Sequence, residues 1–191
     1  MAQKYTAFTI QSKRGFFREI KIPMTITNST DEIQIYKTKR ISVEVISLWD
    51  TGAMQSSISK RLATLLELKP TGMTELMTAG GLVRDVNIYK IDFSLAIKTQ
   101  LDYGEFVSLD IENDFQFYNI EVTEISDNAS FDFLVGMDVI CRGDFSITNR
   151  NSCSCVSFRI PPNPLKTIDY VKDLRDTNKN RNREKRLRKK R

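Results

Sequence analysis

The stretch ISVEVISLWDTGA, residues 41–53, decides the fold of this chain of 191 residues. Residues 41–49 are mostly β-branched or otherwise apolar, which predicts a buried strand that runs into Asp50. An acid, a hydroxyl and a glycine then follow one another in Asp50-Thr51-Gly52. This combination favours a tight loop, because the Thr51 hydroxyl can lock the turn and Gly52 lets the backbone approach another group closely. The stretch therefore predicts a carboxylate held in a hydrogen-bonded loop at the end of a strand.

Two further segments stand in an order that supports such a loop. Residues 134–140, LVGMDVI, predict an apolar strand that breaks at Gly136 into a short helical turn. Before them along the chain, Thr78-Ala79-Gly80-Gly81 has the composition of a hairpin tip, with a β-like run on either side. A loop aspartate, a glycine-rich hairpin and a glycine-broken apolar strand therefore follow one another in the sequence.

These three segments, in this order, resemble the retropepsin-like (retroviral-type) aspartic proteases over roughly residues 40–160. In that family, an apolar-apolar-Gly-x-Asp/Asn-apolar-apolar segment passes behind the catalytic loop, and a flap lies between the two in sequence. The resemblance implies an all-β fold, a closed acid-protease-type β-barrel with one or two short helices, and a protease domain over residues 1–164. Two positions depart from the family pattern. Trp49 stands where a smaller aliphatic residue is more common, and Met137 stands where viral members carry an arginine that helps lock the dimer.

The resemblance also implies a reaction that one carboxylate cannot perform alone. Aspartic proteases use two carboxylates that share one proton, one as general base on a water and the other as general acid toward the scissile carbonyl. This chain has no second Asp-Ser/Thr-Gly, and Asp176-Thr177-Asn178 lies in a polar segment without an apolar strand before it. The expected enzyme is therefore a C2 homodimer, an aspartic endopeptidase that activates a water between two Asp50 carboxylates.

The resemblance assigns roles to individual residues. Beside Asp50, Thr51 would donate across the dimer axis, and Gly52 would leave room for the substrate backbone. A polypeptide substrate would be bound by Ala53 next to the loop, by Val135, and by a mobile lid formed by Thr78, Ala79, Gly80 and Gly81. For the apolar candidates for pocket walls, ordinary core packing is the simpler interpretation; these are Ile46, Leu134, Val135 and Met137. No metal or cofactor is expected.

Composition excludes the main alternative catalytic chemistries. The chain contains no histidine, which excludes Ser-His-Asp and Cys-His catalysis and the zinc sites that need imidazole. The glycine motifs of nucleotide-binding proteins and of the hydrolase nucleophile elbow are absent as well. Its three cysteines are most simply read as reduced thiols. With no run of about 18 apolar residues and no apolar leader, we expect a cytoplasmic protein without a membrane span.

The remaining sequence predicts many short strands and one credible helix. The helix is expected over residues 59–68, with Ser57 or Ser59 as its cap and with Pro70 and Gly72 after its end. The cluster Asn28-Ser29-Thr30-Asp31 predicts a turn. The strand patterns lie at residues 4–10, 16–27, 32–36, 41–49, 86–97, 106–111, 117–125, 132–140, 145–149 and 156–160.

The C-terminal part of the chain differs from the rest in charge. Residues 178–191, NKNRNREKRLRKKR, hold nine Lys/Arg and one Glu, a net charge of +8, whereas the 20 basic and 23 acidic residues over 1–177 give −3. Helical spacing of apolar residues predicts a short helix over 165–177, followed by a tail that we expect to be disordered. Residues 165–191 would then lie outside the protease domain. The partner of residues 178–191 would be anionic, a nucleic acid or an acidic membrane surface, unless this tail has no fixed partner.

Two other functions fit the same residues. One is a non-catalytic retropepsin-like domain that binds extended peptides or serves only for dimerisation. The other is a nucleic-acid-associated protein led by its basic tail, with the protease-like body as scaffold. Cleavage that depends on Asp50 would distinguish the protease from both.

Overall fold

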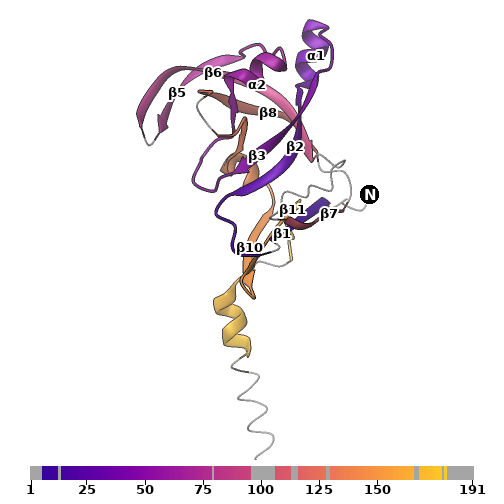
Figure 1. Cartoon of the computed structure of the whole chain (residues 1–191), viewed down its shortest axis with the longest axis vertical. Helices are drawn as coiled ribbons and strands as arrows, with labels where there is room; N and C mark the ends of the chain where they lie inside the picture. Colours follow the sequence, from indigo (N-terminus) through magenta and orange to yellow (C-terminus); the bar gives the residue numbers. More distant parts are fainter. Residues whose placement is uncertain are drawn as a thin grey trace, which may run out of the picture.

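A computed structural model of the chain describes residues 6–12, 14–78, 80–95, 106–112, 116–127, 130–165, 168–177 and 179. Most of these residues lie in strands and the helices are short, so the expected β-rich class is confirmed for the described part (Figure 1). The elements in chain order are β1 (Thr6–Ser12), β2 (Ile20–Asn28), α1 (Thr30–Tyr36), β3 (Ser42–Trp49), β4 (Ser57–Ser59), α2 (Lys60–Leu65), β5 (Gly72–Thr78), β6 (Gly81–Leu95), β7 (Phe106–Glu112), β8 (Gln116–Ile125), β9 (Phe133–Val135), α3 (Met137–Ile140), β10 (Asp144–Arg150) and β11 (Cys153–Ile160).

The strands form two sheets. The larger has the order β2-β3-β9-β4-β8-β6-β5, and the smaller has the order β10-β11-β1-β7. In the larger sheet, β2 pairs with β3 on one side and with β6 on the other, both in antiparallel fashion. Its neighbours therefore run from β2 through β3, β9, β4, β8 and β6 and back to β2. Strand β5 is attached to β6 outside this circuit.

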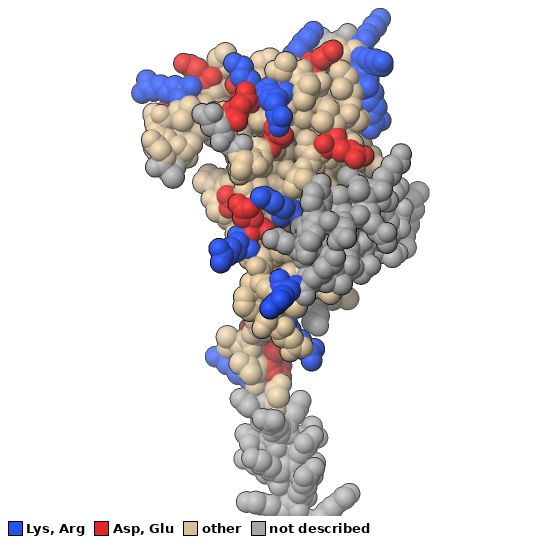
Figure 2. Space-filling model, viewed as in Figure 1, with Lys and Arg blue, Asp and Glu red and all other residues tan. Residues whose placement is uncertain are grey.

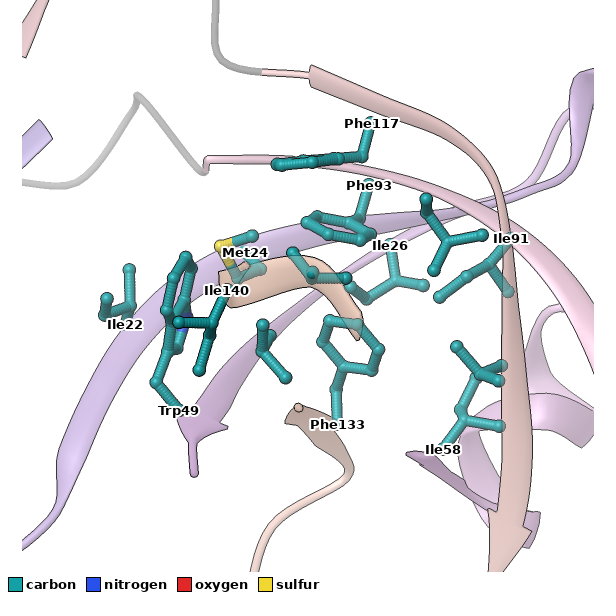
Figure 3. Packing of buried hydrophobic residues seen from close by; sticks show 14 of the residues in the cluster. Ile22, Met24, Ile26, Trp49, Ile58, Ile91, Phe93, Phe117, Phe133 and Ile140 are labelled. Atoms are coloured by element: carbon teal, nitrogen blue, oxygen red, sulfur yellow. The ribbon is translucent and has the colours of Figure 1, made fainter. Parts of the chain in front are cut away.

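The hydrophobic core lies mostly among the strands of the larger sheet and also includes side chains from β1 and β11 of the smaller sheet. Alternate residues of β2 supply Ile22, Met24 and Ile26, all fully buried, as expected when every second side chain of a strand faces the core. Aromatic rings pack beside them, with centroids 4.8 Å apart for Phe93 and Phe117. Figure 3 shows these side chains converging from separate strands. Burial on this scale, at roughly 25 cal/mol per Å² of apolar surface, is the main force that holds the strands together.

One expected strand is a helix. Residues 32–36 have apolar residues at alternate positions, yet they lie in α1, and Ile35 is 70% exposed. The polar cluster before them starts the helix, because Ile33 N–H donates to Ser29 O at 3.0 Å. Thr30 donates its backbone N–H to the carboxylate of Asp92, a buried residue of β6, at 3.1 Å. The strand prediction was wrong because this carboxylate, distant in sequence, satisfies a helix N-terminus.

Other local predictions are confirmed. The helix after the Asp50 loop is α2, and its cap is Ser59, whose Oγ accepts from Leu62 N–H at 3.1 Å. The strands expected at residues 145–149 and 156–160 are β10 and β11, which pair with each other as an antiparallel hairpin. The expected C-terminal helix occupies residues 170–177, a shorter span than 165–177. The tail at 180–191, expected to be disordered, lies outside the described residues.

None of the helices in the described part of the chain has the length and apolar character that crossing a bilayer requires. The three cysteines, all among the described residues, form no disulfide.

Candidate active site

Asp50 follows directly on β3 and begins a tight loop. Its backbone N–H donates to Val135 O at 3.0 Å, which extends the pairing of β3 with β9 by one bond. Its Oδ1 accepts from Gly52 N–H at 2.8 Å, and its carbonyl accepts from Ala53 N–H at 3.3 Å. Asp50 is half-buried, whereas Thr51 and Gly52 are exposed. The loop therefore fixes one carboxylate at the surface, as the sequence of residues 50–52 predicts.

The position of the loop follows from the three strands beneath it. Strand β9 lies between β3 and β4, parallel to β3 and antiparallel to β4. The chain leaves β3 at Trp49 and returns in β4 at Ser57. Residues 50–56 must therefore cross the C-terminal end of β9. This topology brings the glycine-broken segment after β9, residues 136–138, against the loop.

The contact between residues 136–138 and the loop is close and involves the backbone. Met137 N–H donates to Ala53 O at 2.8 Å, and Asp138 N–H donates to Met54 O at 3.2 Å. A Cβ on Gly136 would lie 2.6 Å from the carbonyl carbon of Gln55. Only glycine allows this approach, since real Cβ contacts are longer than 3.0 Å. Residues 136–138 thus support the Asp50 loop through direct contacts.

Ser56 joins the two segments, and sequence reasoning missed it. Its Oγ accepts from Gly136 N–H at 3.0 Å and donates to Asp138 Oδ1 at 2.8 Å. The residue is fully buried, where an unpaired hydroxyl or amide would be unfavourable by about 1–3 kcal/mol. Its signal in the sequence is weak, because a serine after a turn is also a plausible helix cap.

The wall behind the loop is aromatic. Trp49, the residue before Asp50, is 3% exposed, and its ring centroid lies 5.3 Å from that of Phe8 and 5.3 Å from that of Phe158. Phe145 stacks on the same indole at 6.0 Å. These three rings come from β1, β11 and β10 of the smaller sheet. The large residue at 49 is therefore accommodated by a sheet that packs against the end of β3.

The glycine-rich segment at residues 78–81 is the tip of a long hairpin of β5 and β6. Thr78 pairs with Gly81, and Thr78 Oγ1 donates to Gly81 O at 2.9 Å and accepts from Gly80 N–H at 3.2 Å. Gly81 has a φ of +111°, a conformation that L side chains rarely adopt. Ala79 lies outside the described residues. In Figure 1 the hairpin extends away from the rest of the molecule.

The arms of the hairpin expose apolar side chains near the tip. The exposed fractions are 78% for Met77, 47% for Leu82 and 47% for Val83. These three side chains therefore do not belong to the hydrophobic core of the chain. Met54, next to Ala53 in the loop, is 84% exposed as well.

The base of the hairpin is fixed by a buried polar cluster. Tyr89 of β6 is 5% exposed, and its hydroxyl donates to Glu124 of β8. Asn87 Nδ2 donates to the same carboxylate at 3.1 Å. Burial, with the neighbouring Glu124, raises the pKa of Tyr89 to about 12. The tip is thus exposed while the base is anchored to the body.

The apolar pocket candidates lie mostly behind the loop. Val135 is fully buried and Leu134 is 9% exposed, while Met137 packs against the core from a partly buried position. Val135 meets Asp50 through its carbonyl, as described above. Among the described residues, no group of three or more His, Cys, Asp or Glu side chains is arranged to hold a metal ion.

Comparison with solved structures finds 12 chains that match this one. The chain is similar to the crystal structure of a retropepsin-like aspartic protease from Rickettsia conorii, with 14% sequence identity. The alignment covers 83% of this chain and 98% of that chain, with a TM-score of 0.45. No protein-family model and no curated protein matches the sequence.

Proposed function

We propose that this chain is a retropepsin-like aspartic endopeptidase whose catalytic domain spans residues 1–164. The circuit of strands from β2 through β6 back to β2 supports a closed acid-protease-type barrel. The observation that carries the proposal is the Asp50 loop, in which the carboxylate accepts from Gly52 N–H at 2.8 Å. An ordinary turn aspartate does not need a second segment in backbone contact with its loop. The contacts of residues 136–138 with the loop therefore favour a functional role for Asp50.

Peptide hydrolysis requires a second carboxylate, which the proposal takes from another copy of the chain. In a C2 homodimer, each Asp50 lies on its own copy of the loop and the two meet at the axis. One carboxylate accepts a proton from a bound water, and the other, protonated, donates to the scissile carbonyl oxygen. The water oxygen bonds to the carbonyl carbon, and collapse of the resulting diol breaks the C–N bond as the amine takes a proton. The exposed Thr51 is available to donate to the partner loop across the axis.

The polypeptide substrate would lie between this loop and the hairpin. Gly52 and Ala53 would face its backbone, and the tip at residues 78–81 would close over it with β-type hydrogen bonds. The exposed Met77 and Leu82 would contact its side chains. Val135 would act from behind, through the bond that its carbonyl accepts from Asp50 N–H. We further propose a cytoplasmic protein that needs no cofactor.

Cleavage of an unfolded protein between pH 3 and pH 8 tests the proposal. We expect Asp50→Asn to abolish cleavage, because the amide cannot act as the base while the loop keeps its shape. Asp31→Asn, at an exposed position of α1, is the matched control and should cleave like the parent. A statine-type transition-state analogue should inhibit the parent. If Asp50→Asn cleaves as well as the parent, the catalytic role of Asp50 is wrong.

Mixing experiments test the homodimer separately. At a constant total concentration of chains, Asp50→Asn chains should trap parent chains in inactive mixed dimers, so activity should fall with the square of the parent fraction. A linear fall would mean that each chain acts alone. If the parent binds peptides but never cleaves them, the non-catalytic peptide-binding domain becomes the function that fits.

A further inference from the structure

Apolar side chains are concentrated on the segment that follows the last strand. The exposed fractions are 93% for Leu165, 55% for Ile168, 65% for Tyr170, 58% for Val171 and 64% for Leu174. In Figure 1 the helix that carries the last three, drawn in yellow, extends away from both sheets. Within the described residues, nothing of the body covers these side chains. Five large apolar residues in so short a stretch indicate a surface that meets something else.

The helix at residues 170–177 is specified locally and is amphipathic. Asp169 caps its start, because its Oδ1 accepts from Lys172 N–H at 3.0 Å and its carbonyl accepts from Asp173 N–H at 2.9 Å. Tyr170, Val171 and Leu174 stand at positions i, i+1 and i+4, so they share one face. The opposite face carries Lys172 and Asp176. Figure 2 shows charged and uncharged surface side by side on this segment.

Strong positive charge follows the apolar face directly. Residues 178–191 contain nine Lys/Arg and one Glu, a net charge of +8, next to a body with a net charge of −3 over residues 1–177. The two features, an apolar face and a basic run, are therefore adjacent in the chain. An apolar face is typical of a segment that contacts an apolar partner, and a basic run is typical of one that binds an anionic partner. Few partners are both apolar and anionic.

We propose that residues 165–191 dock on an anionic lipid surface. The face formed by Tyr170, Val171 and Leu174 enters the boundary between headgroups and acyl chains, and the Lys/Arg of residues 178–191 contact the acidic headgroups. Binding of this kind increases with the buried apolar area and with electrostatic attraction to anionic lipids, so the two features together bind more tightly than either one alone. The attachment is peripheral and does not depend on Asp50.

Two other occupants match only half of these features. A nucleic acid would satisfy the charge of the tail but leave the apolar face in water. A second copy of the chain would cover the apolar face but would leave the charge of the tail, +8, without a partner. A lipid surface matches both features, the apolar face at the acyl boundary and the positive charge at the headgroups.

Co-sedimentation of the full chain with vesicles tests the proposal. We expect the parent to bind phosphatidylcholine vesicles that contain phosphatidylserine, and to bind pure phosphatidylcholine at least about tenfold more weakly. The double substitution Val171→Ser with Leu174→Ser removes the apolar face without changing the charge, and it should weaken binding to the anionic vesicles roughly tenfold or more. Ile35→Ser, which changes a residue 70% exposed on α1, is the matched control and should bind like the parent. Unchanged melting temperatures will show that both variants keep their fold.

Three outcomes would overturn the proposal. The first is parent binding that is absent or equal on the two kinds of vesicle. The second is anionic-vesicle binding that the double substitution leaves unchanged, which would mean that charge alone attracts the tail. The third is a single-stranded RNA that displaces the parent from anionic vesicles while binding the double variant as tightly as the parent, which would favour a nucleic-acid partner.

Discussion

Replacement of Gly136 by alanine tests the contact on which the candidate site depends. The new Cβ would lie 2.6 Å from the carbonyl carbon of Gln55, 2.7 Å from its oxygen and 3.0 Å from Ser56 N. All three are backbone atoms, so no side-chain rotation can make room, and the loop that carries Asp50 has to move. Such movement also strains the bond from Gly136 N–H to Ser56 Oγ. We expect the free energy of unfolding to fall by about 3 kcal/mol, the upper part of the range for overpacking.

For a chain of this size, that loss corresponds to a melting temperature lower by about 6–12 °C. Thermal and denaturant unfolding followed by circular dichroism measure it. Gly72→Ala is the neutral control, because its Cβ would meet only Ile88 Cδ1 at 3.8 Å, and its stability should be equal or slightly higher. Gly143→Ala is the second control. Its Cβ would collide with Arg159 O, so this variant should also lose stability, but through a clash away from the Asp50 loop. Equal unfolding midpoints for Gly136→Ala and Gly72→Ala would refute the close approach.

Two further substitutions test other parts of the structure. Ser56→Ala should lower the free energy of unfolding by about 1–3 kcal/mol, because it leaves the buried Gly136 N–H without an acceptor. Ser157→Ala, which removes a hydroxyl of the smaller sheet, should lower it less. Equal losses of the two variants in denaturant unfolding would contradict the role of Ser56. Asp144→Asn should lower stability by less than about 1 kcal/mol at pH 7, because the pair it belongs to is partly exposed. The hydrogen bond from Arg159 holds the pKa of the Asp144 carboxyl below its ordinary value, so its contribution is present above about pH 4 and is lost as the pH falls through that lowered pKa. Melting temperatures measured from pH 7 down to pH 2 check this, and a difference that does not vary with pH would contradict it.

Most strands, and the helix after the Asp50 loop, could be predicted from sequence patterns that extend over only a few residues. The strand that ends at Trp49 and the alternation after Val86 depend on neighbours within a few residues, and such neighbours also decide the cap at Ser59. The segment at residues 32–36 could not be predicted in this way. Its alternating apolar residues fit a strand, but the carboxylate of Asp92 stabilises a helix N-terminus there. A partner that far along the chain leaves no periodic signal.

The candidate site shows the same division. Asp50 and Gly52 could be identified from the sequence, because a carboxylate in a tight turn demands particular residue types. Gly136 could be identified from the family pattern that residues 134–140 resemble. Ser56 could not be identified, because a serine has several ordinary uses, and its value here comes from two groups on a distant segment. Likewise, Trp49 is an unusual residue in the sequence pattern, and only the packing of the smaller sheet explains it.

By itself, the sequence determined the kind of element at most positions and the loop at Asp50. Local sterics and hydrogen bonding decide these features, and they act over a few residues. Only the tertiary structure decided that β9 lies between β3 and β4, so that residues 136–138 meet the loop, and that residues 170–177 stay uncovered. These depend on which strands pair and which faces are buried, and both result from contacts between residues far apart in the chain.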